Sequence, residues 1–373
     1  MVVEVAWVNG LAAIRSLGRQ GLRVLAVDHR AGALGLRSRY AEARLAPDPL
    51  DDEDGFIEVL RTIAEQTDDV LPVFPTHDEH LNAIARHAGV LGDRYRFPFP
   101  SWDVLEKIQS KRHQLETAEA AGIPIPRTLY PSSAEDARAA GEEIGFPLVV
   151  KPSANVGFRR SHKRQLFRCE TPAELERAYE LAAPHEPMVQ ELIPSGPEEM
   201  YTLGSYLDRD GEALGLFSGH KLSQTRGYMG SARTGEALWV EEVVEQGLAL
   251  LRALGFHGIS QVEVMRDPRD GRYKLLEVNP RLWQWHSLAA ACGVDLPWIA
   301  YRDLIGDPLA PVLHHKSGKR WAITVMAGAS HAVQRRPYVD AVFAKDDPKP
   351  ALVHFARYTL HGVRSLKGAA PRG

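Results

Sequence analysis

Two apolar segments that flank Asp267-Pro-Arg-Asp-Gly271 predict a β-hairpin, the feature that most constrains how this chain can fold. Side chains alternate along a strand, so Glu277 and Asn279 point to the same face of the hairpin. Folding back at the turn brings Glu263 to about the level of Glu277. The pattern therefore predicts two carboxylates and one amide oxygen in a single patch.

This predicted patch has two interpretations. Carboxylates that lie opposite each other repel, and a cation between them relieves the repulsion. Carboxylate and amide oxygens are hard donors that suit Mg²⁺ and leave coordination positions for phosphate oxygens. The alternative is a solvated sheet face whose acids pair with nearby lysine or arginine side chains.

The first hundred residues alternate between strand and helix patterns. Apolar segments 2–8 and 22–27 predict strands, and an apolar stripe from Leu11 to Arg19 predicts a helix that follows a turn at Asn9-Gly10. Such alternation is typical of a parallel α/β sheet with right-handed crossovers. A dinucleotide site is disfavoured, because the first turn offers only one of the three glycines that this motif needs.

The rest of the chain mixes hairpins with helices, which is typical of an α+β fold. A Pro/Phe-rich tract near residue 100 marks a boundary, and a single helix is expected from about Trp102 to Ala121. We expect three parts, at residues 1–100, 101–307 and 308–373. The last is a C-terminal extension with an amphipathic helix that Leu352, Phe355, Leu360 and Val363 would line.

Composition excludes several classes of protein. The 373 residues carry a formal charge of −3, which gives no reason to expect nucleic acid or a membrane as partner. Cys169 and Cys292 are the only cysteines and form no paired pattern, so a disulfide framework or thiolate zinc site is not expected. With neither a basic leader nor an apolar run of about 20 residues, the sequence predicts a cytoplasmic protein.

Glu263 followed by Glu277-Val278-Asn279-Pro280-Arg281 resembles the signature of the ATP-grasp superfamily. The sequence Arg281-Leu-Trp283-Gln-Trp285-His286 and the long C-terminal extension most resemble the predicted carboxylate–amine ligases of that superfamily. The resemblance implies an ATP-grasp domain over 101–307, with a mobile lid at about 127–195. The parallel α/β segment would then be the small domain that precedes ATP-grasp in such proteins.

The resemblance also implies roles for individual residues. Glu263, Glu277 and Asn279 would bind one or two Mg²⁺ ions, with Mn²⁺ as a substitute, and Arg281 would hold the substrate carboxylate. Lys221 would face the phosphate or the substrate. The residues expected to contact ATP are Lys111 and Lys151 at the phosphates, Gln190, Glu191 and Ile193 at the adenine, and Glu198 or Glu199, left undecided, at the ribose.

One loop departs from the superfamily pattern. The segment after Lys151 is usually rich in glycine and serine, whereas residues 153–164 contain one glycine and are strongly basic. This loop either covers the triphosphate with side chains or binds an anionic substrate.

The implied activity is ligation of a small carboxylate, with amino acids among the candidates, to an amine through an acyl phosphate, with release of ADP and phosphate. Two other functions stay open within this resemblance: activation of bicarbonate, and ATP binding without turnover in a regulatory protein. Neither substrate is identified by the sequence, and a homodimer is a further implication of the resemblance.

Overall fold

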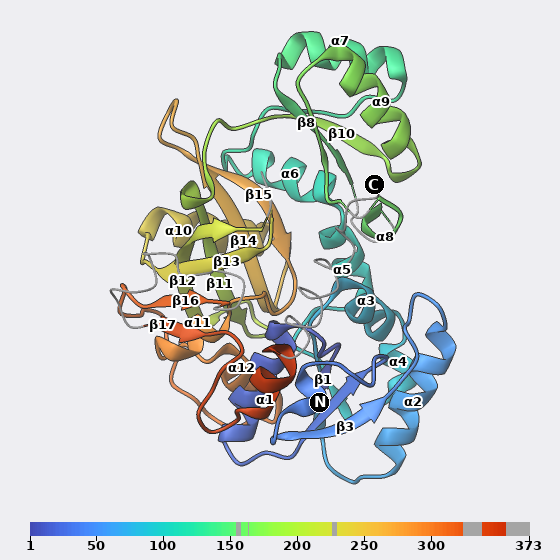
Figure 1. Ribbon diagram of the computed structural model, residues 1–373, viewed down its shortest axis with the longest axis vertical. Coiled ribbons are helices and arrows are strands. Elements are labelled where there is room, and N and C mark those ends of the chain that lie inside the picture. Colours follow the sequence, from blue (N-terminus) through green and yellow to red (C-terminus); the bar gives the residue numbers. More distant parts are fainter. Residues whose placement is uncertain (154–157, 163, 226–229, 324–337, 356–373) are drawn as a thin grey trace, which may run out of the picture.

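The computed structural model describes residues 1–153, 158–162, 164–225, 230–323 and 338–355 (Figure 1). Three layers of structure follow one another along its long axis. A blue N-terminal sheet lies at one end, a small green sheet at the other, and a seven-stranded sheet lies between them. Within the described residues, no helix has the length and apolar character that crossing a membrane requires.

The N-terminal sheet is parallel, in the order β3-β2-β1-β5. This arrangement confirms the predicted parallel α/β architecture at the start of the chain. A separate pair of strands, β4 and β6, lies beside it. The elements are β1 Val2–Val3, α1 Val8–Arg19, β2 Val24–Asp28, η1 Gly35–Arg37, β3 Ala41–Leu45, α2 Glu53–Glu65, β4 Leu71–Pro72, β5 Phe74–Pro75, α3 Asp78–Arg86, α4 Ala88–Leu91 and β6 Tyr95–Arg96.

The predicted turn at Asn9-Gly10 is wrong, because both residues lie inside α1. The first strand is correspondingly short and ends at Val3. A Cβ at Gly10 would lie 2.6 Å from the Cα of Val5. The glycine therefore serves the close packing of α1 on the segment that follows β1, and not a change of chain direction.

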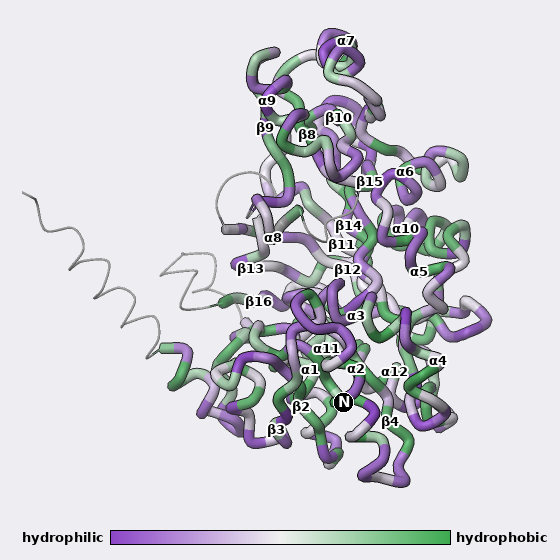
Figure 2. Tube along the Cα trace, turned by 90° about the vertical axis from the view of Figure 1, so that its right-hand side faces the viewer, coloured by the Kyte–Doolittle hydropathy of each residue, from purple (hydrophilic) through white to green (hydrophobic). Residues whose placement is uncertain are grey.

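The small sheet has the order β7-β10-β8-β9, and α7 and α9 pack against it. Figure 2 shows α7, at the tip of the molecule, as largely hydrophilic. The elements of this part are β7 Thr128–Leu129, α7 Ala134–Ile144, β8 Leu148–Pro152, α8 Phe158–His162, β9 Phe167–Cys169, α9 Pro172–Ala182, η2 Ala183–His185 and β10 Pro187–Glu191.

The helix expected over about 102–121 is two helices, α5 Trp102–Gln109 and α6 Lys111–Ala120. Ser110 separates them, and its hydroxyl caps α6 by accepting a hydrogen bond from the backbone N–H of His113. The break places Lys111 at the first position of α6, where its N–H donates to the Ser153 carbonyl at 2.8 Å.

The central sheet has the order β15-β14-β11-β12-β13-β16-β17. Its last two strands come from the C-terminal segment, which therefore extends the sheet. Its main apolar core also includes side chains of β1 and α1, so the N-terminal sheet packs directly against this part. The elements are η3 Pro197–Glu199, β11 Met200–Leu207, β12 Ala213–Gln224, β13 Ala232–Ala237, α10 Glu241–Ala253, β14 Gly258–Arg266, β15 Tyr273–Asn279, α11 Ser287–Ala291, α12 Leu296–Leu304, β16 Arg320–Ala322 and β17 Tyr338–Asp340.

The C-terminal segment also contacts the N-terminal helix. Asp347 is fully buried and accepts hydrogen bonds from the Arg15 guanidinium at 2.9 Å and the Ser38 hydroxyl at 2.8 Å. Residues 349–355 are helical, but Leu352 and Phe355, two residues of the predicted apolar face, are exposed. Leu360 and Val363, the other two residues of that pattern, lie outside the described residues.

Candidate active site

The β14–β15 hairpin places its acids as the sequence pattern predicts. Glu263 lies directly opposite Glu277, and Gln261 lies opposite Asn279. The side chains of the two glutamates are 11% and 23% exposed. Burial raises the pKa of Glu263, and the nearby negative charge of Glu277 raises it further.

Each glutamate pairs with a lysine that the sequence had singled out. Lys111 Nζ lies 2.7 Å from Glu277 Oε2, and Lys221 Nζ lies 2.8 Å from Glu263 Oε1. Burial would raise the pKa of Glu277, but the charge and hydrogen bond of Lys111 hold it well below its usual range. Both lysines are buried. The acids therefore do pair with cations, but in the interior, which excludes a solvated sheet face.

Lys151 is a third buried cation, and its hydrogen-bonding partner is a neutral side chain. Its ammonium donates to Gln190 Oε1 at 2.7 Å, and the Gln190 amide donates to Thr128. Burial lowers the pKa of Lys151 to about 8, and the positive charge of Lys111 adds to this effect. An anion bound beside Lys151 would offset that burial.

Arg281 links the hairpin to the N-terminal sheet. Its Nε and Nη2 donate to the two carboxylate oxygens of Asp78 at 2.6 and 3.1 Å. Burial would lower the pKa of Arg281, but the charge of Asp78 more than offsets this and raises it. Asp78 stands in the first turn of α3, directly after the carboxyl end of β5.

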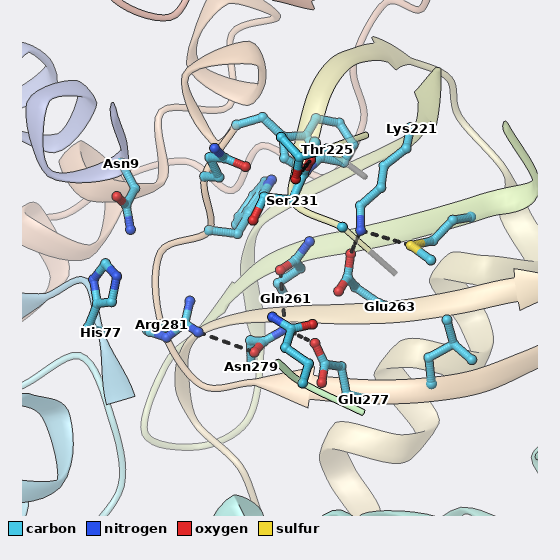
Figure 3. Close-up of a pocket in the computed structure, with 18 of the residues that line it drawn as sticks. Asn9, His77, Lys221, Thr225, Ser231, Gln261, Glu263, Glu277, Asn279 and Arg281 are labelled. Carbon is cyan, nitrogen blue, oxygen red and sulfur yellow. Dashed lines mark hydrogen bonds and ion pairs between the residues drawn. The ribbon is translucent and has the colours of Figure 1, made fainter. Parts of the chain in front are cut away.

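These side chains converge on one pocket of about 340 Å³ (Figure 3). In the close-up, Asn9 and His77 form one wall beside Arg281, while Lys221 and Glu263 lie on the opposite side. The pocket brings together seven of the predicted site residues: Lys111, Lys151, Lys221, Glu263, Glu277, Asn279 and Arg281.

The residues predicted to contact adenine and ribose do not line this pocket. The Glu191 carboxylate pairs with Arg269 and Lys274, and the backbone N–H of Glu191 donates to the Arg127 carbonyl. Gln190 accepts a hydrogen bond from Lys151, which lines the pocket. Ile193 is buried; Glu198 is exposed and Glu199 partly so. The roles of these residues stay predictions.

The sequence did not single out the individual residues on the wall that the N-terminal part contributes to the pocket. Trp7, Asn9 and His77 line the pocket, and Asp78 holds Arg281. Their shared signal is that each follows a strand of a parallel sheet, because ligands of such sheets bind at the carboxyl ends of the strands. Gln261, opposite Asn279, follows from the hairpin register alone.

Part of the basic loop at 153–164, namely residues 154–157 and 163, lies outside the described residues, as do residues 226–229 between β12 and β13. The described neighbours Gln165, Leu166, Thr225 and Ser231 line the pocket. The described residues next to both segments therefore border the site.

Comparisons with known proteins identify the fold as an ATP-grasp fold. The family described as carbamoyl-phosphate synthase L chain, ATP binding domain, matches residues 235–311, which include the acidic hairpin. The structure resembles biotin carboxylase from Campylobacter jejuni, with a TM-score of 0.68, 19% identity, and coverage of 86% of this chain and 73% of that one. These findings confirm the predicted ATP-grasp fold with its preceding parallel sheet.

Particular relatives include ligases. The chain is 26% identical over 240 residues to the D-aspartate ligase of Enterococcus faecium (strain Aus0004), spanning 61% of this chain and 57% of the relative. It is 29% identical over 223 residues to the carbamoyl phosphate synthase large chain of Hyperthermus butylicus, of which it spans 20%. It also resembles the structure of L-amino acid ligase from Bacillus licheniformis, with a TM-score of 0.62, 17% identity, and coverage of 83% of this chain and 74% of that one.

Proposed function

We propose that this chain is a Mg-ATP-dependent ligase that converts a carboxylate to an acyl phosphate and joins it to an amine, releasing ADP and phosphate. The observation that carries the proposal is the convergence of three buried lysines, two facing glutamates and Arg281 on one pocket. The ligase names among the relatives support the same class of reaction.

The donor set fits a magnesium ion. Glu263 and Glu277 face each other across paired strands, and Asn279 adds an amide on the same face of the sheet as Glu277. Asn279 now donates from Nδ2 to Glu277, so binding a cation would require its amide to turn and present Oδ1. Among the described residues no three His, Cys, Asp or Glu side chains cluster, so phosphate and water oxygens would complete the coordination shell.

The chemistry follows from the charges in the pocket. Bound Mg²⁺ would withdraw charge from the β- and γ-phosphates of ATP. Lys111 and Lys151 would stabilise the same phosphates, because a preorganised cation in a site screened from water stabilises developing charge strongly. Arg281 keeps Nη1 outside its pair with Asp78 and would hold the acid through that nitrogen. Attack by the amine would then break the C–O bond to phosphate and form the amide.

We further propose three functional parts, at 1–100, 101–307 and 308–373, with residues 127–195 acting as a lid over ATP. Lys151 supports this proposal, because it comes from the small sheet and still lines the pocket. In the lid, the Glu191 carbonyl and the Ile193 N–H would contact adenine. Glu198 or Glu199 would take the ribose.

A screen for ADP release tests the ligase proposal. The protein would be incubated with MgATP and the proteinogenic L-amino acids, D-aspartate or D-alanine as acids, with hydroxylamine as a common nucleophile. Acid-dependent ADP release with formation of a hydroxamate is the expected result, and its absence with every acid would contradict the proposal. Repeating the assay with Mn²⁺ in place of Mg²⁺ tests whether Mn²⁺ can substitute. Measuring the molecular mass of the protein in solution tests whether it forms a homodimer.

Activation of bicarbonate is a second candidate, favoured by the resemblance to biotin carboxylase and to carbamoyl phosphate synthase. It predicts that bicarbonate alone stimulates ADP release, without any organic acid. A response to the organic acids and none to bicarbonate would decide for the carboxylate–amine ligase.

A further inference from the structure

A carboxylate–imidazole pair stands at the wall that the N-terminal sheet contributes to the pocket. Glu4 follows β1, and its side chain is only 4% exposed. His77 follows β5, is 26% exposed and lines the pocket. His77 Nδ1 lies 2.9 Å from Glu4 Oε2, so a buried carboxylate holds a histidine that reaches the site.

The backbone at Glu4 is held in an uncommon conformation. Its φ is 61°, in the left-handed region that a residue with a side chain adopts at a cost of about 1–3 kcal/mol. Neighbouring bonds hold it there: Val5 N–H donates to Asp28 at 2.8 Å, and Gly35 N–H donates to the Val5 carbonyl at 2.7 Å. Such strain is concentrated at functional sites, because the surrounding structure must maintain it.

The pair fixes which ring nitrogen accepts a proton. Because the Glu4 carboxylate binds the Nδ1–H of His77, the neutral ring carries its lone pair on Nε2. Figure 3 shows His77 beside Asn9 and Arg281 on one wall of the pocket. A carboxylate that sets the tautomer of a histidine is the arrangement by which proteins prepare an imidazole to take a proton.

The amine half of the proposed reaction needs a proton acceptor. An amine is mostly an ammonium ion at neutral pH and cannot attack until it loses a proton. The lysines and Arg281 are cations, while Glu263 and Glu277 already pair with lysines. His77, which Glu4 holds through Nδ1, lines the pocket on the wall beside Arg281 and is an imidazole that can take a proton.

We infer that His77, oriented by Glu4, is the general base that deprotonates the attacking amine; this inference rests on the proposed ligase function. The ammonium gives a proton to Nε2, and its nitrogen lone pair forms a C–N bond with the acyl carbon. The C–O bond to phosphate breaks, and phosphate leaves with that electron pair. The attacking nitrogen then loses its second proton, to water, and forms the neutral amide.

Charged groups from four elements face this histidine. Glu4 follows β1, Arg30 follows β2 and pairs with both Glu4 and Asp28, Asp78 begins α3, and Arg281 follows β15. Within α3, His80 also interacts with the charge of His77. Two acids and two arginines, paired as Glu4–Arg30 and Asp78–Arg281, therefore make up this surrounding, and their formal charges cancel.

Hydroxylamine provides a test, because it is largely unprotonated at neutral pH and needs no base. His77→Gln and the unaltered protein would be compared using the acid that gives the most hydroxamate, with hydroxylamine, glycine, L-lysine or ammonium chloride as nucleophile. Ligation to glycine, L-lysine or ammonium should fall about 10²–10⁴-fold in the variant, the range typical of a general base. Hydroxamate formation should change little. Ligation to the amines by the variant should recover as the pH rises toward the pKa of the amine itself, because without the base only unprotonated amine can attack.

A matched control is His87→Gln. His87 forms a similar pair with Glu53 at 3.0 Å and does not line the pocket, so both reactions should survive the change. Glu4→Gln should reproduce the selective loss of amine ligation to a smaller degree. Equal losses with hydroxylamine and amines, no loss with either, or no amide from any of these amines in the unaltered protein would overturn the inference. If the unaltered protein forms no hydroxamate at all, the ligase proposal fails, and the role of His77 fails with it.

Discussion

Replacing Asp78 with asparagine tests the ion pair between Asp78 and Arg281, which links the N-terminal sheet to the hairpin. The change keeps the shape of the side chain but removes one charge of a bidentate pair whose partners are 16% and 17% exposed. Removing one partner of a fully buried pair costs about 3–5 kcal/mol, whereas an exposed pair is worth about 0–1 kcal/mol. This pair lies between those limits, so we expect a loss of about 2 kcal/mol, or about 2–3 °C in the unfolding temperature of a 373-residue chain.

The pH dependence of this loss can be worked out. Burial would raise the pKa of Asp78, but the charge and hydrogen bonds of Arg281 more than offset this and lower it. A carboxylate with a lowered folded pKa stabilises the protein above its unfolded pKa of about 3.9, and this contribution disappears as the pH falls through the folded value. The gap in stability between the unaltered protein and Asp78→Asn should therefore be full at neutral pH and shrink below about pH 4.

Thermal unfolding followed by circular dichroism between acidic and neutral pH measures this gap. Glu79→Gln is the matched control, because Glu79 stands in the same first turn of α3 and equally affects the helix dipole. A gap that is absent, that does not depend on pH, or that Glu79→Gln reproduces would refute the reasoning.

Three further predictions concern the pocket and the core. Glu277→Gln should lower acid-dependent ADP release about 10²–10³-fold without changing the far-UV circular dichroism spectrum, because it removes one preorganised charge; an active variant would contradict its role. Burial lowers the pKa of Lys151 to about 8, so the KM for MgATP should rise above pH 8, and it should stay flat in Lys151→Arg, whose charge persists. A Cβ at Gly204 would overlap the ring of Trp283, so Gly204→Ala should cost about 1–3 kcal/mol in thermal unfolding. Gly89→Ala, where a Cβ meets nothing within 4 Å, should cost little.

The acidic hairpin could be predicted from the sequence because its determinants are local. Alternation along each strand and one turn sequence are enough to place Glu263 opposite Glu277, as the register shows. The strand that carries Lys151 is equally local, since its apolar residues end where the lysine begins. Such features depend on neighbours within about a dozen residues, so propensity and periodicity describe them well.

The partners of these residues could not be predicted in the same way. Asp78 and Arg281 are 203 residues apart, and nothing in either neighbourhood specifies the other. His77 follows an apolar strand, as many polar residues do, and its importance comes from Glu4, which packing brings beside it. The break at Ser110 was missed because the apolar pattern of α5 and α6 runs on across it, whereas the serine cap decides the boundary.

The pairing of β13 with β16 has a consequence for folding while the chain is being synthesised. Thr234 pairs with Ala322, and Glu236 with Arg320, so the strand that covers β13 is synthesised long after β13 itself. Until then, β13 is the open edge of the growing sheet, and open edges pair readily with other chains. A chain that stops before residue 320 would carry the complete acidic hairpin and Arg281, yet keep that edge exposed. We therefore expect C-terminal truncation to cause aggregation before it impairs the chemistry of the pocket.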